Sequence, residues 1–350
     1  MKSLSANALP RIAAIASTLL LMFLLGQFPA TAATNPDATI DGLKAKYVDV
    51  NGIRTRYYEY GQGEPLVMIH GGAQAGATTA NVFSRNIPGL AKHFHVFAMD
   101  RLACGLTGNP KEDGEYNQQG EVDFIYAFIR TMKLGQVHLI GHSAGGGLVF
   151  YLAVQHPDIV RTLTILAMGP EDPPQGPSKL DPLLKKCADQ AQYAGLKCRL
   201  SLLAWLPDTF PNEYWEADQS MSDLPKSKEA RAKLGAGVGK LPDFPAWRQQ
   251  QWDRVQKDGV LQMPVLMVAG KNDILDWGEN DATAKLPGEL GLFDIVATRN
   301  VKVQMLVYNN GGHFMYREHP DQFNQDYINF VDFWEHHATG TPAKAVGPLQ

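Results

Sequence analysis

Short apolar runs recur along the chain, separated by segments whose composition suits helices. The runs are residues 66–70, 96–100, 137–141, 163–168, 265–269 and 301–308. Runs this short, bounded by glycine, proline and polar residues, are typical of strands buried on both faces of a parallel sheet. Residues 47–60 instead predict two antiparallel strands around Asn51-Gly52, a strong hairpin signal. The pattern therefore predicts an α/β fold with an antiparallel start.

One interval between runs is unusually long. About 95 residues separate Met168 from Val265, far more than a strand-helix-strand crossover needs. The interval is rich in proline at first and then carries helix-like segments with tryptophans, and structureless loops of that length are rare. We therefore expect a helical insertion packed over an edge of the sheet. The predicted organisation is a core of residues 40–168 and 263–338, a cap over residues 169–262 and a flexible tail over residues 339–350.

The first residues differ from the rest of the chain. Lys2 and Arg11 precede a short apolar stretch, which is followed by an A-x-A site at Ala30 and Ala32. This arrangement is typical of a secretory signal peptide, whereas a retained membrane anchor needs about 20 apolar residues. We expect a signal peptide over residues 1–32, export to the periplasm or the medium, and no stable membrane anchor after cleavage. An uncleaved anchor is the alternative.

Composition narrows the class of partner. Hydrophobic residues make up 45% and charged residues 19% of the chain, as in an ordinary globular protein. The formal net charge of -4 gives no electrostatic case for nucleic acid or for anionic lipid. We therefore expect a small-molecule partner.

Three cysteines in an exported chain suggest one disulfide and one free thiol. Cys187 and Cys198 are the expected pair, because Gly195 between them gives the chain a place to fold back. Three free thiols are the alternative.

The candidate nucleophile lies at a predicted strand-to-helix turn. Gly141-His-Ser-Ala-Gly145 fits G-x-S-x-G, with an apolar strand before it and a helix-compatible stretch after it. At such a turn the serine adopts a strained backbone that exposes its hydroxyl, and glycines leave room for the adjacent strand and helix. We expect Ser143 to be the nucleophile. A glycine-rich packing turn with an incidental serine is the alternative.

A serine nucleophile needs a base within hydrogen-bond reach and an acid that orients the base. Asp273 lies in a turn after one predicted strand, and His313 in a glycine-rich loop after the next. We expect these residues to be the acid and the base. Asp276, Glu171 and Asp172 stay open as alternative acids. Packing or surface roles are expected for the histidines on predicted strands, helices or polar stretches: His93, His95, His138, His156, His319, His336 and His337.

The chemistry also needs donors for the developing oxyanion. A loop with the sequence His-Gly-Gly, residues 70–72, follows a predicted strand. In proteins whose nucleophile lies at a strand-to-helix turn of the G-x-S-x-G type, a loop of this HG type lies beside the nucleophile. We expect the backbone N–H groups of Gly72 and Ala144 to be the donors, and His70 to brace the loop. A plain glycine turn is the alternative for this stretch.

Together these motifs resemble the α/β-hydrolase superfamily. The resemblance rests on residues 66–72, 141–145, 270–273 and 312–320, and it covers roughly residues 47–337. It implies a mostly parallel eight-stranded sheet with helices on both faces, and a helical cap inserted after strand 6.

Residues 100–110 are similar to the D-x-L-G-x-G-x-T-x-N-P stretch of hydrolases in this superfamily that cleave carbon–carbon bonds of ring-fission products. Ala103 replaces a glycine of that subgroup, His142 an asparagine and Phe314 a tryptophan. Because of these departures and the predicted export, we expect hydrolysis of carboxylic esters through an acyl-enzyme, as in a carboxylesterase or lipase. Carbon–carbon or amide bond hydrolysis by the same triad is the alternative, and a non-catalytic binding module is another.

Aromatic residues are candidates for the substrate pocket. Trp205 and Trp215 of the insertion and Phe314 beside the predicted base are expected to contact substrate, with packing between helices as the alternative use of the tryptophans. The sequence has no H-E-x-x-H, paired-cysteine or dinucleotide motif, so neither a metal nor a cofactor is expected.

Overall fold

The computed structural model describes residues 35–75, 78–167, 185–187, 189–190, 192–275 and 288–337. The predicted signal peptide, the predicted tail and the first part of the predicted cap lie outside the described residues, as do the alternative acids Asp276, Glu171 and Asp172. The chain divides into two compact units, Met1–Pro36 and Asp37–Gln350, and the second is described here.

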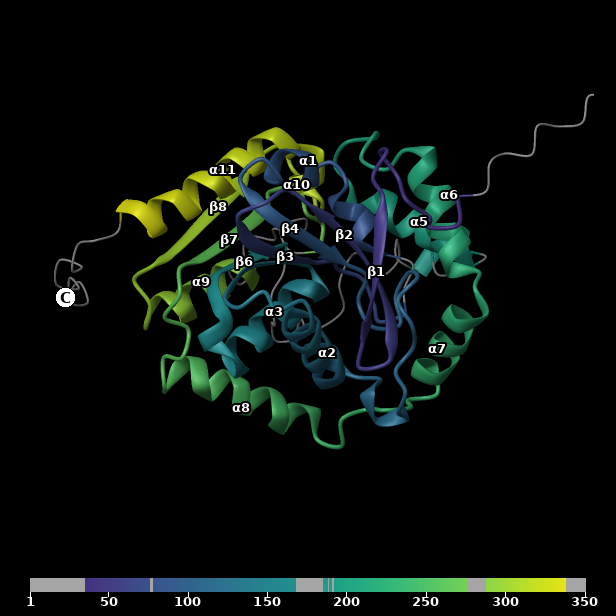
Figure 1. The fold of residues 1–350 in the computed structure, drawn as a ribbon, viewed down its shortest axis with the longest axis horizontal. Helices are drawn as coiled ribbons and strands as arrows, with labels where there is room; N and C mark the ends of the chain where they lie inside the picture. Colours follow the sequence, from purple (N-terminus) through teal and green to yellow (C-terminus); the bar gives the residue numbers. More distant parts are fainter. Residues whose placement is uncertain are drawn as a thin grey trace, which may run out of the picture. The chain divides into compact units, whose positions relative to one another are not determined.

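Within the described residues, one eight-stranded sheet forms the centre of the fold, with strand order β1-β2-β4-β3-β5-β6-β7-β8 (Figure 1). The strands β1 and β2 form an antiparallel hairpin, β2 pairs antiparallel with β4, and every later pairing is parallel. Their bounds are β1 Ala45–Val50, β2 Ile53–Tyr60, β3 Glu64–Ile69, β4 Phe94–Met99, β5 Val137–His142, β6 Val160–Leu166, β7 Val265–Gly270 and β8 Val303–Tyr308. The predicted mostly parallel sheet with an antiparallel start is confirmed.

The hairpin turn has the expected conformation. Asn51 and Gly52 have φ of 52° and 77°, and Val50 pairs directly with Ile53 across the two-residue loop. Positive φ at both central residues matches the right-handed twist of the flanking strands, which is why Asn-Gly is favoured there.

One strand boundary differs from the apolar pattern. β6 begins at Val160, earlier than the run that starts at Leu163. Arg161 and Thr162 hide this start in the sequence because they are polar, but Thr162 is buried and its hydroxyl bonds Nδ1 of His138 on β5 at 2.9 Å. A polar side chain is accommodated in a central strand when a neighbouring strand satisfies it.

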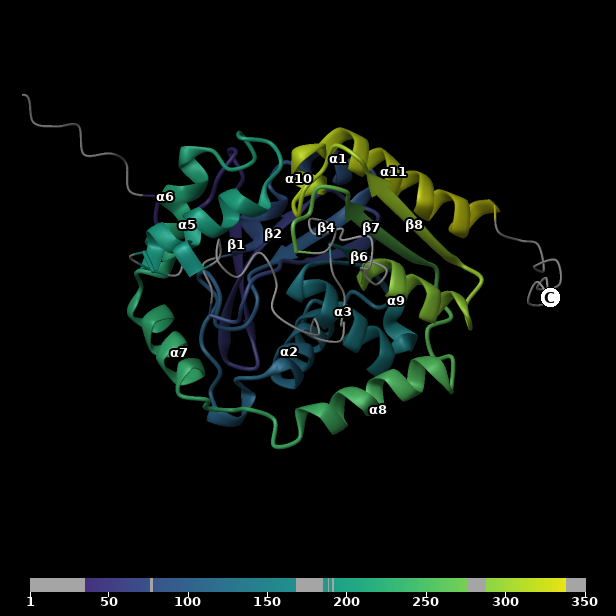
Figure 2. The same ribbon diagram turned by 180° about the vertical axis from the view of Figure 1, so that it is seen from behind.

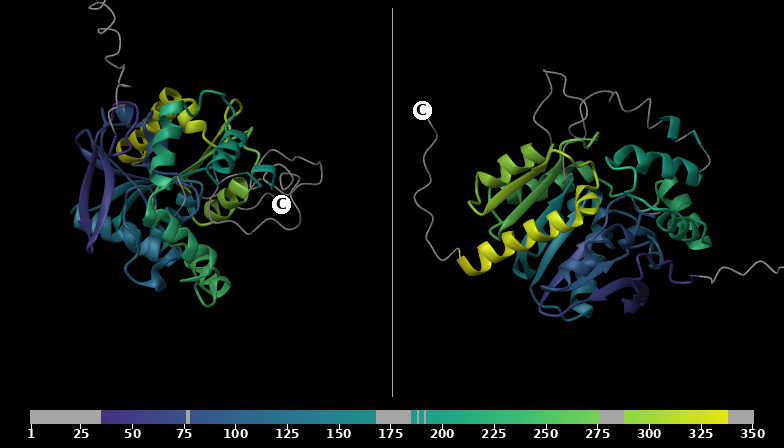
Figure 3. Two further views of the ribbon diagram at one scale, coloured as in Figure 1. Left: turned by 90° about the vertical axis from the view of Figure 1, so that its right-hand side faces the viewer. Right: turned by 90° about the horizontal axis from the view of Figure 1, so that it is seen from above.

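Two hydrophobic clusters cover the two faces of the sheet. Leu66 and Met68 of β3 pack in one cluster with α1 and α11, while Val67 and Ile69 pack in the other with α2 and α3. This division follows from the alternation of side chains along a strand. The right-hand view in Figure 3 shows α11, drawn in yellow, running along one face of the sheet. The helices concerned are α1 Ile87–Leu90, α2 Gln118–Thr131, α3 Ala144–Gln155, α9 Gly288–Ala297, α10 Met315–Glu318 and α11 Pro320–Asp332.

The described part of the segment between β6 and β7 is helical. It contains α5 Gln192–Leu203, α6 Asn212–Ser222, α7 Pro225–Gly235 and α8 Phe244–Gln256 (Figure 2). The last of these helices packs on α3, since the rings of Trp252 and Phe150 lie 5.3 Å apart and those of Trp247 and Tyr151 4.6 Å apart. The boundaries of the predicted cap stay a prediction. No helix in the described part of the chain has the length and apolar character needed to cross a membrane.

A disulfide joins Cys187 to Cys198 at the start of this helical segment, with a Cα–Cα distance of 5.4 Å. Gly195 lies against the bridge, where a Cβ would collide with the backbone oxygen of Cys187. Cys104 is a buried free thiol.

Candidate active site

Ser143 lies at the sharp turn between β5 and α3. Its backbone has φ 53° and ψ −126°, a conformation that is costly for a residue other than glycine. Its N–H donates to the carbonyl oxygen of Leu166 on β6 at 2.8 Å, which anchors the turn to the neighbouring strand. A Cβ on Gly145 would collide with the carbonyl oxygens of Ile69 and His70. Small residues are therefore required where the helix meets the end of β3.

His313 and Asp273 form a buried hydrogen-bonded pair. Nδ1 of His313 lies 2.6 Å from Oδ2 of Asp273, and both side chains are almost fully shielded from solvent. Oδ1 of Asp273 accepts the N–H of Leu275 at 2.9 Å. Since the carboxylate is an acceptor, Nδ1 carries the proton, and Nε2 is left as the basic nitrogen.

Close contact between two loops brings this pair together. Asp273 follows β7 and His313 follows β8, two adjacent parallel strands. A Cβ on Gly270, the last residue of β7, would collide with the backbone oxygen of Gly312 and lie 2.6 Å from that of Gly311. The glycine at the end of β7 allows the turn that carries Asp273 to approach the loop that carries His313.

Two contacts that sequence reasoning missed hold the backbone of the His313 loop. The N–H of His313 donates to the carbonyl oxygen of Leu203 at 3.0 Å, and the N–H of Gly312 donates to Oε2 of Glu318 at 2.8 Å. Oε1 of Glu318 also accepts the N–H of Trp205 at 2.7 Å. The end of α5 is thus joined directly to the loop that carries His313. No sequence signal identifies the contacts that join α5 to this loop, because they link residues far apart in the chain.

His142 supplies the third contact. Its Nε2 donates to the carbonyl oxygen of His313 at 2.9 Å, and the two imidazole rings lie 4.7 Å apart. Burial, and then the nearby charge of His313, lower the pKa of His142 well below its usual value, so the ring is neutral. Its buried Nδ1 has no hydrogen-bond partner among the described residues. The position within the motif was the available signal, and we interpreted it only as a departure from a related subgroup.

The proposed oxyanion donors lie on either side of this turn. Gly72 has φ 82° in the loop after β3, and none of the described residues accepts its N–H. Ala144 is the first residue of α3, where an N–H has no acceptor within the helix. His70 donates from Nδ1 to the carbonyl oxygen of Gly71 at 2.8 Å and accepts the N–H of Arg101 on Nε2 at 3.0 Å. Burial lowers the pKa of His70 to about 3, so it is a neutral bracing group.

The three aromatic candidates lie in different environments. Phe314 is buried beside the base, with ring centroids 5.2 Å from His313 and 4.7 Å from Phe210. Trp215 packs on Phe210 at 5.1 Å within the hydrophobic cluster. Trp205 is 52% exposed at the end of α5. Of these three candidates, only Phe314 is in ring contact with the predicted base.

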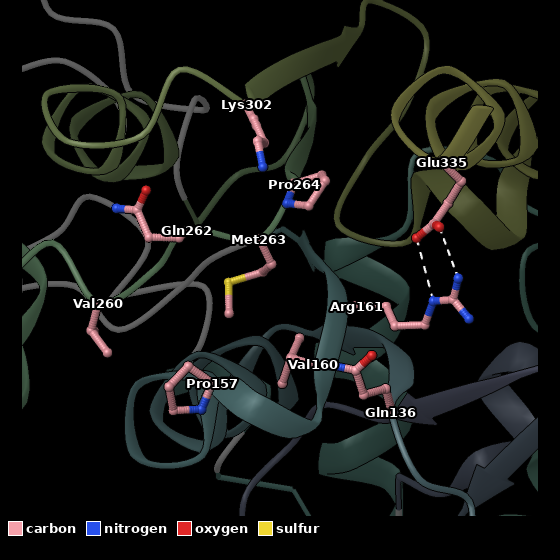
Figure 4. Close-up of a pocket in the computed structure, with 10 residues that line it drawn as sticks. All are labelled: Gln136, Pro157, Val160, Arg161, Val260, Gln262, Met263, Pro264, Lys302 and Glu335. Atoms are coloured by element: carbon pink, nitrogen blue, oxygen red, sulfur yellow. Dashed lines mark hydrogen bonds and ion pairs between the residues drawn. The ribbon is translucent and has the colours of Figure 1, made fainter. Parts of the chain in front are cut away.

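A cavity of about 370 Å³ lies away from these residues (Figure 4). Val160, Pro264 and Lys302 line it, at or just before the amino-terminal ends of β6, β7 and β8. Ser143, Asp273 and His313 all follow carboxyl-terminal strand ends, which lie at the opposite edge of the sheet. In the described ranges, no cluster of three or more histidine, cysteine, aspartate or glutamate residues is placed to hold a metal ion.

Comparison with known proteins defines the class. The model of the α/β hydrolase fold family matches residues 64–320, so this chain belongs to that family. The 2-hydroxymuconate semialdehyde hydrolase of Pseudomonas sp. (strain CF600) is 29% identical over 273 residues, which cover 78% of this chain and 88% of that enzyme. The 2-hydroxy-6-oxo-6-(2'-aminophenyl)hexa-2,4-dienoic acid hydrolase of Metapseudomonas resinovorans is 38% identical over 122 residues, covering 35% of this chain and only 41% of that enzyme.

Solved structures support the fold assignment. The carbazole-degradation serine hydrolase CarC has a TM-score of 0.61 at 21% identity, covering 83% of this chain and 99% of its own. The meta-cleavage product hydrolase CumD of Pseudomonas fluorescens IP01 has a TM-score of 0.63 at 19% identity, covering 83% and 98%. The predicted α/β-hydrolase fold and the resemblance to ring-fission hydrolases are confirmed.

The prediction of ester hydrolysis as the main activity is wrong. Two of the relatives are named as hydrolases of 2-hydroxymuconate semialdehyde and of a 2-hydroxy-6-oxo-dienoic acid, and CumD is described as a meta-cleavage product hydrolase, which agrees with the carbon–carbon alternative. A serine triad serves either bond, so the motifs do not distinguish them. The departures at Ala103, His142 and Phe314 carry less weight than the similarity over the rest of the chain.

Proposed function

We propose that this chain is a serine hydrolase that cleaves a carbon–carbon bond in a ring-fission product of the 2-hydroxy-6-oxo-dienoate class. The observation that carries the proposal is the 2.6 Å hydrogen bond between His313 and Asp273, on loops at the same sheet edge as the strained turn at Ser143. The substrate class comes from the relatives, among them a 2-hydroxy-6-oxo-2,4-heptadienoate hydrolase.

Each residue has a defined role in this reaction. Ser143 attacks the keto carbon C6 while Nε2 of His313 takes the hydroxyl proton. Asp273 holds the opposite nitrogen of the imidazole and stabilises the imidazolium that forms. The N–H groups of Gly72 and Ala144 donate to the oxyanion that develops on the former keto oxygen.

Breaking the carbon–carbon bond requires a leaving carbon that can carry negative charge. In the 2-oxo tautomer of such a dienoate, C5 is conjugated through the C3–C4 double bond to the carbonyl at C2. When the tetrahedral species collapses, the C5–C6 bond breaks, its electron pair is delocalised as a dienolate, and the dienolate takes the proton from His313. Water deprotonated by His313 then releases the acyl group from Ser143 as a carboxylic acid.

The test compares wild type with Ser143→Ala on 2-hydroxy-6-oxo-2,4-heptadienoate. Loss of the conjugated absorbance gives the rate, and we expect the variant to be slower by about 10⁴-fold or more. Ser220→Ala is the matched control, because among the described residues that hydroxyl donates to the carbonyl oxygen of Ala217, on its own helix, at 2.7 Å. Turnover by Ser143→Ala at the rate of Ser220→Ala would contradict the proposal.

We also propose that residues 1–32 direct export, on the strength of their sequence pattern alone. Protein recovered from the periplasm or the medium is expected to begin near Ala33. Recovery of the full-length chain from the cytoplasm alone would contradict this.

A further inference from the structure

Arg101 lies beneath the loop that carries the proposed oxyanion donor Gly72. Since β3 and β4 are parallel neighbours with Ile69 opposite Met99, the loops that follow them lie side by side. Nη1 of Arg101 donates to three successive carbonyl oxygens of the first loop: His70 at 3.3 Å, Gly71 at 3.1 Å and Gly72 at 2.7 Å. One guanidinium nitrogen therefore hydrogen-bonds to three consecutive backbone carbonyls.

Glu121 on α2 fixes the orientation of this guanidinium. Its two oxygens accept from Nε of Arg101 at 2.9 Å and from Nη2 at 2.8 Å. Both side chains are buried, with 3% and 5% exposure. The two-pronged contact uses one edge of the guanidinium and leaves Nη1 for the loop.

The carbonyl contacts determine where the N–H groups of the loop point. In a trans peptide unit the C=O of one residue and the N–H of the next point in opposite directions. The carbonyl of Gly71 points towards Arg101, so the N–H of Gly72 points away from it. Gly71 itself lies against the nucleophile, since a Cβ there would be 2.7 Å from Cβ of Ser143. The side of the loop opposite Arg101 is thus the side on which an oxyanion would form.

We propose that Arg101, held by Glu121, is the positioning group for the oxyanion hole of this enzyme. Arg101 touches no reacting atom and acts only through the peptide planes of residues 70–72. The inference rests on the proposed role of Ser143 as nucleophile. It adds the buried Arg101–Glu121 ion pair as the group that aligns the N–H of Gly72.

The test is the rate at which a fluorophosphonate labels Ser143 in the full-length protein, because the phosphoryl oxygen of the probe occupies the oxyanion position. The substitution Arg101→Lys keeps the positive charge at this position. The single ammonium group of lysine cannot bind both oxygens of Glu121 and the loop carbonyls at the same time, as the guanidinium does. We expect Arg101→Lys to lower the second-order labelling constant by about 10²-fold, comparable to the loss of an oxyanion donor. Glu121→Gln is expected to shift the constant in the same direction.

Arg56→Lys is the matched control. Arg56 is equally buried and pairs with Asp100 at 3.0 Å, but among the described residues its guanidinium donates no hydrogen bond to residues 70–72. It is expected to lose stability as Arg101→Lys does, while its labelling constant stays close to that of wild type. Labelling of folded Arg101→Lys at the rate of Arg56→Lys would overturn the proposal. If Arg101→Lys does not fold, Glu121→Gln decides by the same comparison.

A second readout separates positioning from general damage. With the dienoate substrate, a group that acts on the transition state lowers kcat and leaves KM nearly unchanged. One outcome is that labelling depends on Arg101 although the protein does not cleave the dienoate. This outcome would reject the proposed substrate and keep the role of Arg101. The other outcome is that wild type cleaves the dienoate while Arg101→Lys and Glu121→Gln are labelled as fast as wild type. This outcome would keep the proposed substrate and reject the role of Arg101.

Discussion

The imidazole of His313 is held through both its ring and its backbone. Asp273 fixes which nitrogen carries the proton, and His142 holds the carbonyl oxygen of the same residue. The side-chain contact sets the tautomer, whereas the backbone contact sets where the ring sits. Two separable predictions follow from these two contacts.

Asp273→Asn tests the side-chain contact. The amide keeps the volume of the carboxyl group but its nitrogen is a donor, so it favours the wrong tautomer and leaves the imidazolium unsupported. We expect kcat to fall by about 10⁴-fold, as in other triads of this kind. Steady-state kinetics on the dienoate provide the measurement, with Asp253→Asn on α8, where the carboxylate pairs with Lys257, as the control. Comparable kcat values for the two variants would rule out Asp273 as the acid.

His142→Phe tests the backbone contact. The phenyl ring fills a similar volume but donates nothing to the carbonyl oxygen of His313. A small displacement of a reacting group costs up to about 10²-fold, so we expect kcat to fall by between about 10-fold and that limit. His142→Gln retains an N–H donor and should recover part of the rate. If glutamine and phenylalanine give the same kcat, the hydrogen bond has no role in positioning.

At the scale of elements, the turn between β5 and α3 is tightly constrained by its surroundings. Gly145 lies so close to the end of β3 that any side chain would displace the loop carrying His70 and Gly72. The turn thus fixes the proposed nucleophile Ser143 and the proposed oxyanion loop relative to each other.

Gly145→Ala is expected to lower both stability and activity, because the added methyl group forces these backbones apart. Overpacking of this kind typically costs about 1 to 3 kcal/mol of unfolding free energy. Gly291→Ala is the matched control, since Gly291 is also within a helix and has open space around it; there alanine should stabilise by up to about 1 kcal/mol. Urea unfolding measures the change in unfolding free energy for each variant, which is expected to be a decrease for Gly145→Ala and an increase for Gly291→Ala. The same change in both variants would refute the steric argument.

The elements themselves were largely predictable from the sequence. The apolar runs located the strands, and Asn51-Gly52 located the hairpin, because burial on both faces and turn geometry are local demands on residue type. The start of β6 was missed, because Arg161 and Thr162 satisfy their polar groups through partners on other segments.

The candidate site was predictable only in part. The turn at Ser143 and the loops of Asp273 and His313 follow strand ends, which the sequence pattern reveals. The contact of Leu203 with His313 and that of Trp205 with Glu318 depend on how the end of α5 meets the His313 loop, and no local pattern encodes that meeting. The identity of the bond cleaved was not predictable either, because it depends on the shape of the pocket around a triad that many reactions share.

At the scale of the whole molecule, two buried neutral histidines make the fold sensitive to acid. Burial lowers the pKa of His70 to about 3 and that of His142 well below its usual value. The unfolded chain binds protons at both positions below about pH 6.5, whereas the folded chain does not, so acid favours the unfolded state.

The unfolding free energy is therefore expected to decrease as pH falls from about 6.5 towards 3, by up to about 1.4 kcal/mol per pH unit for each histidine. Urea unfolding at a series of pH values measures this slope. His70→Gln should flatten the curve, while His93→Gln at an exposed site should not. A slope in His70→Gln as steep as in wild type would show that His70 is not the buried neutral group described.

The most direct test of the central claim is product analysis with the dienoate in ¹⁸O-labelled water. Wild type incubated with 2-hydroxy-6-oxo-2,4-heptadienoate is expected to release acetate that carries oxygen from water, together with the shortened dienoate, and Ser143→Ala should release neither. An unchanged dienoate, in the presence of wild-type protein that cleaves a p-nitrophenyl ester, would contradict the account.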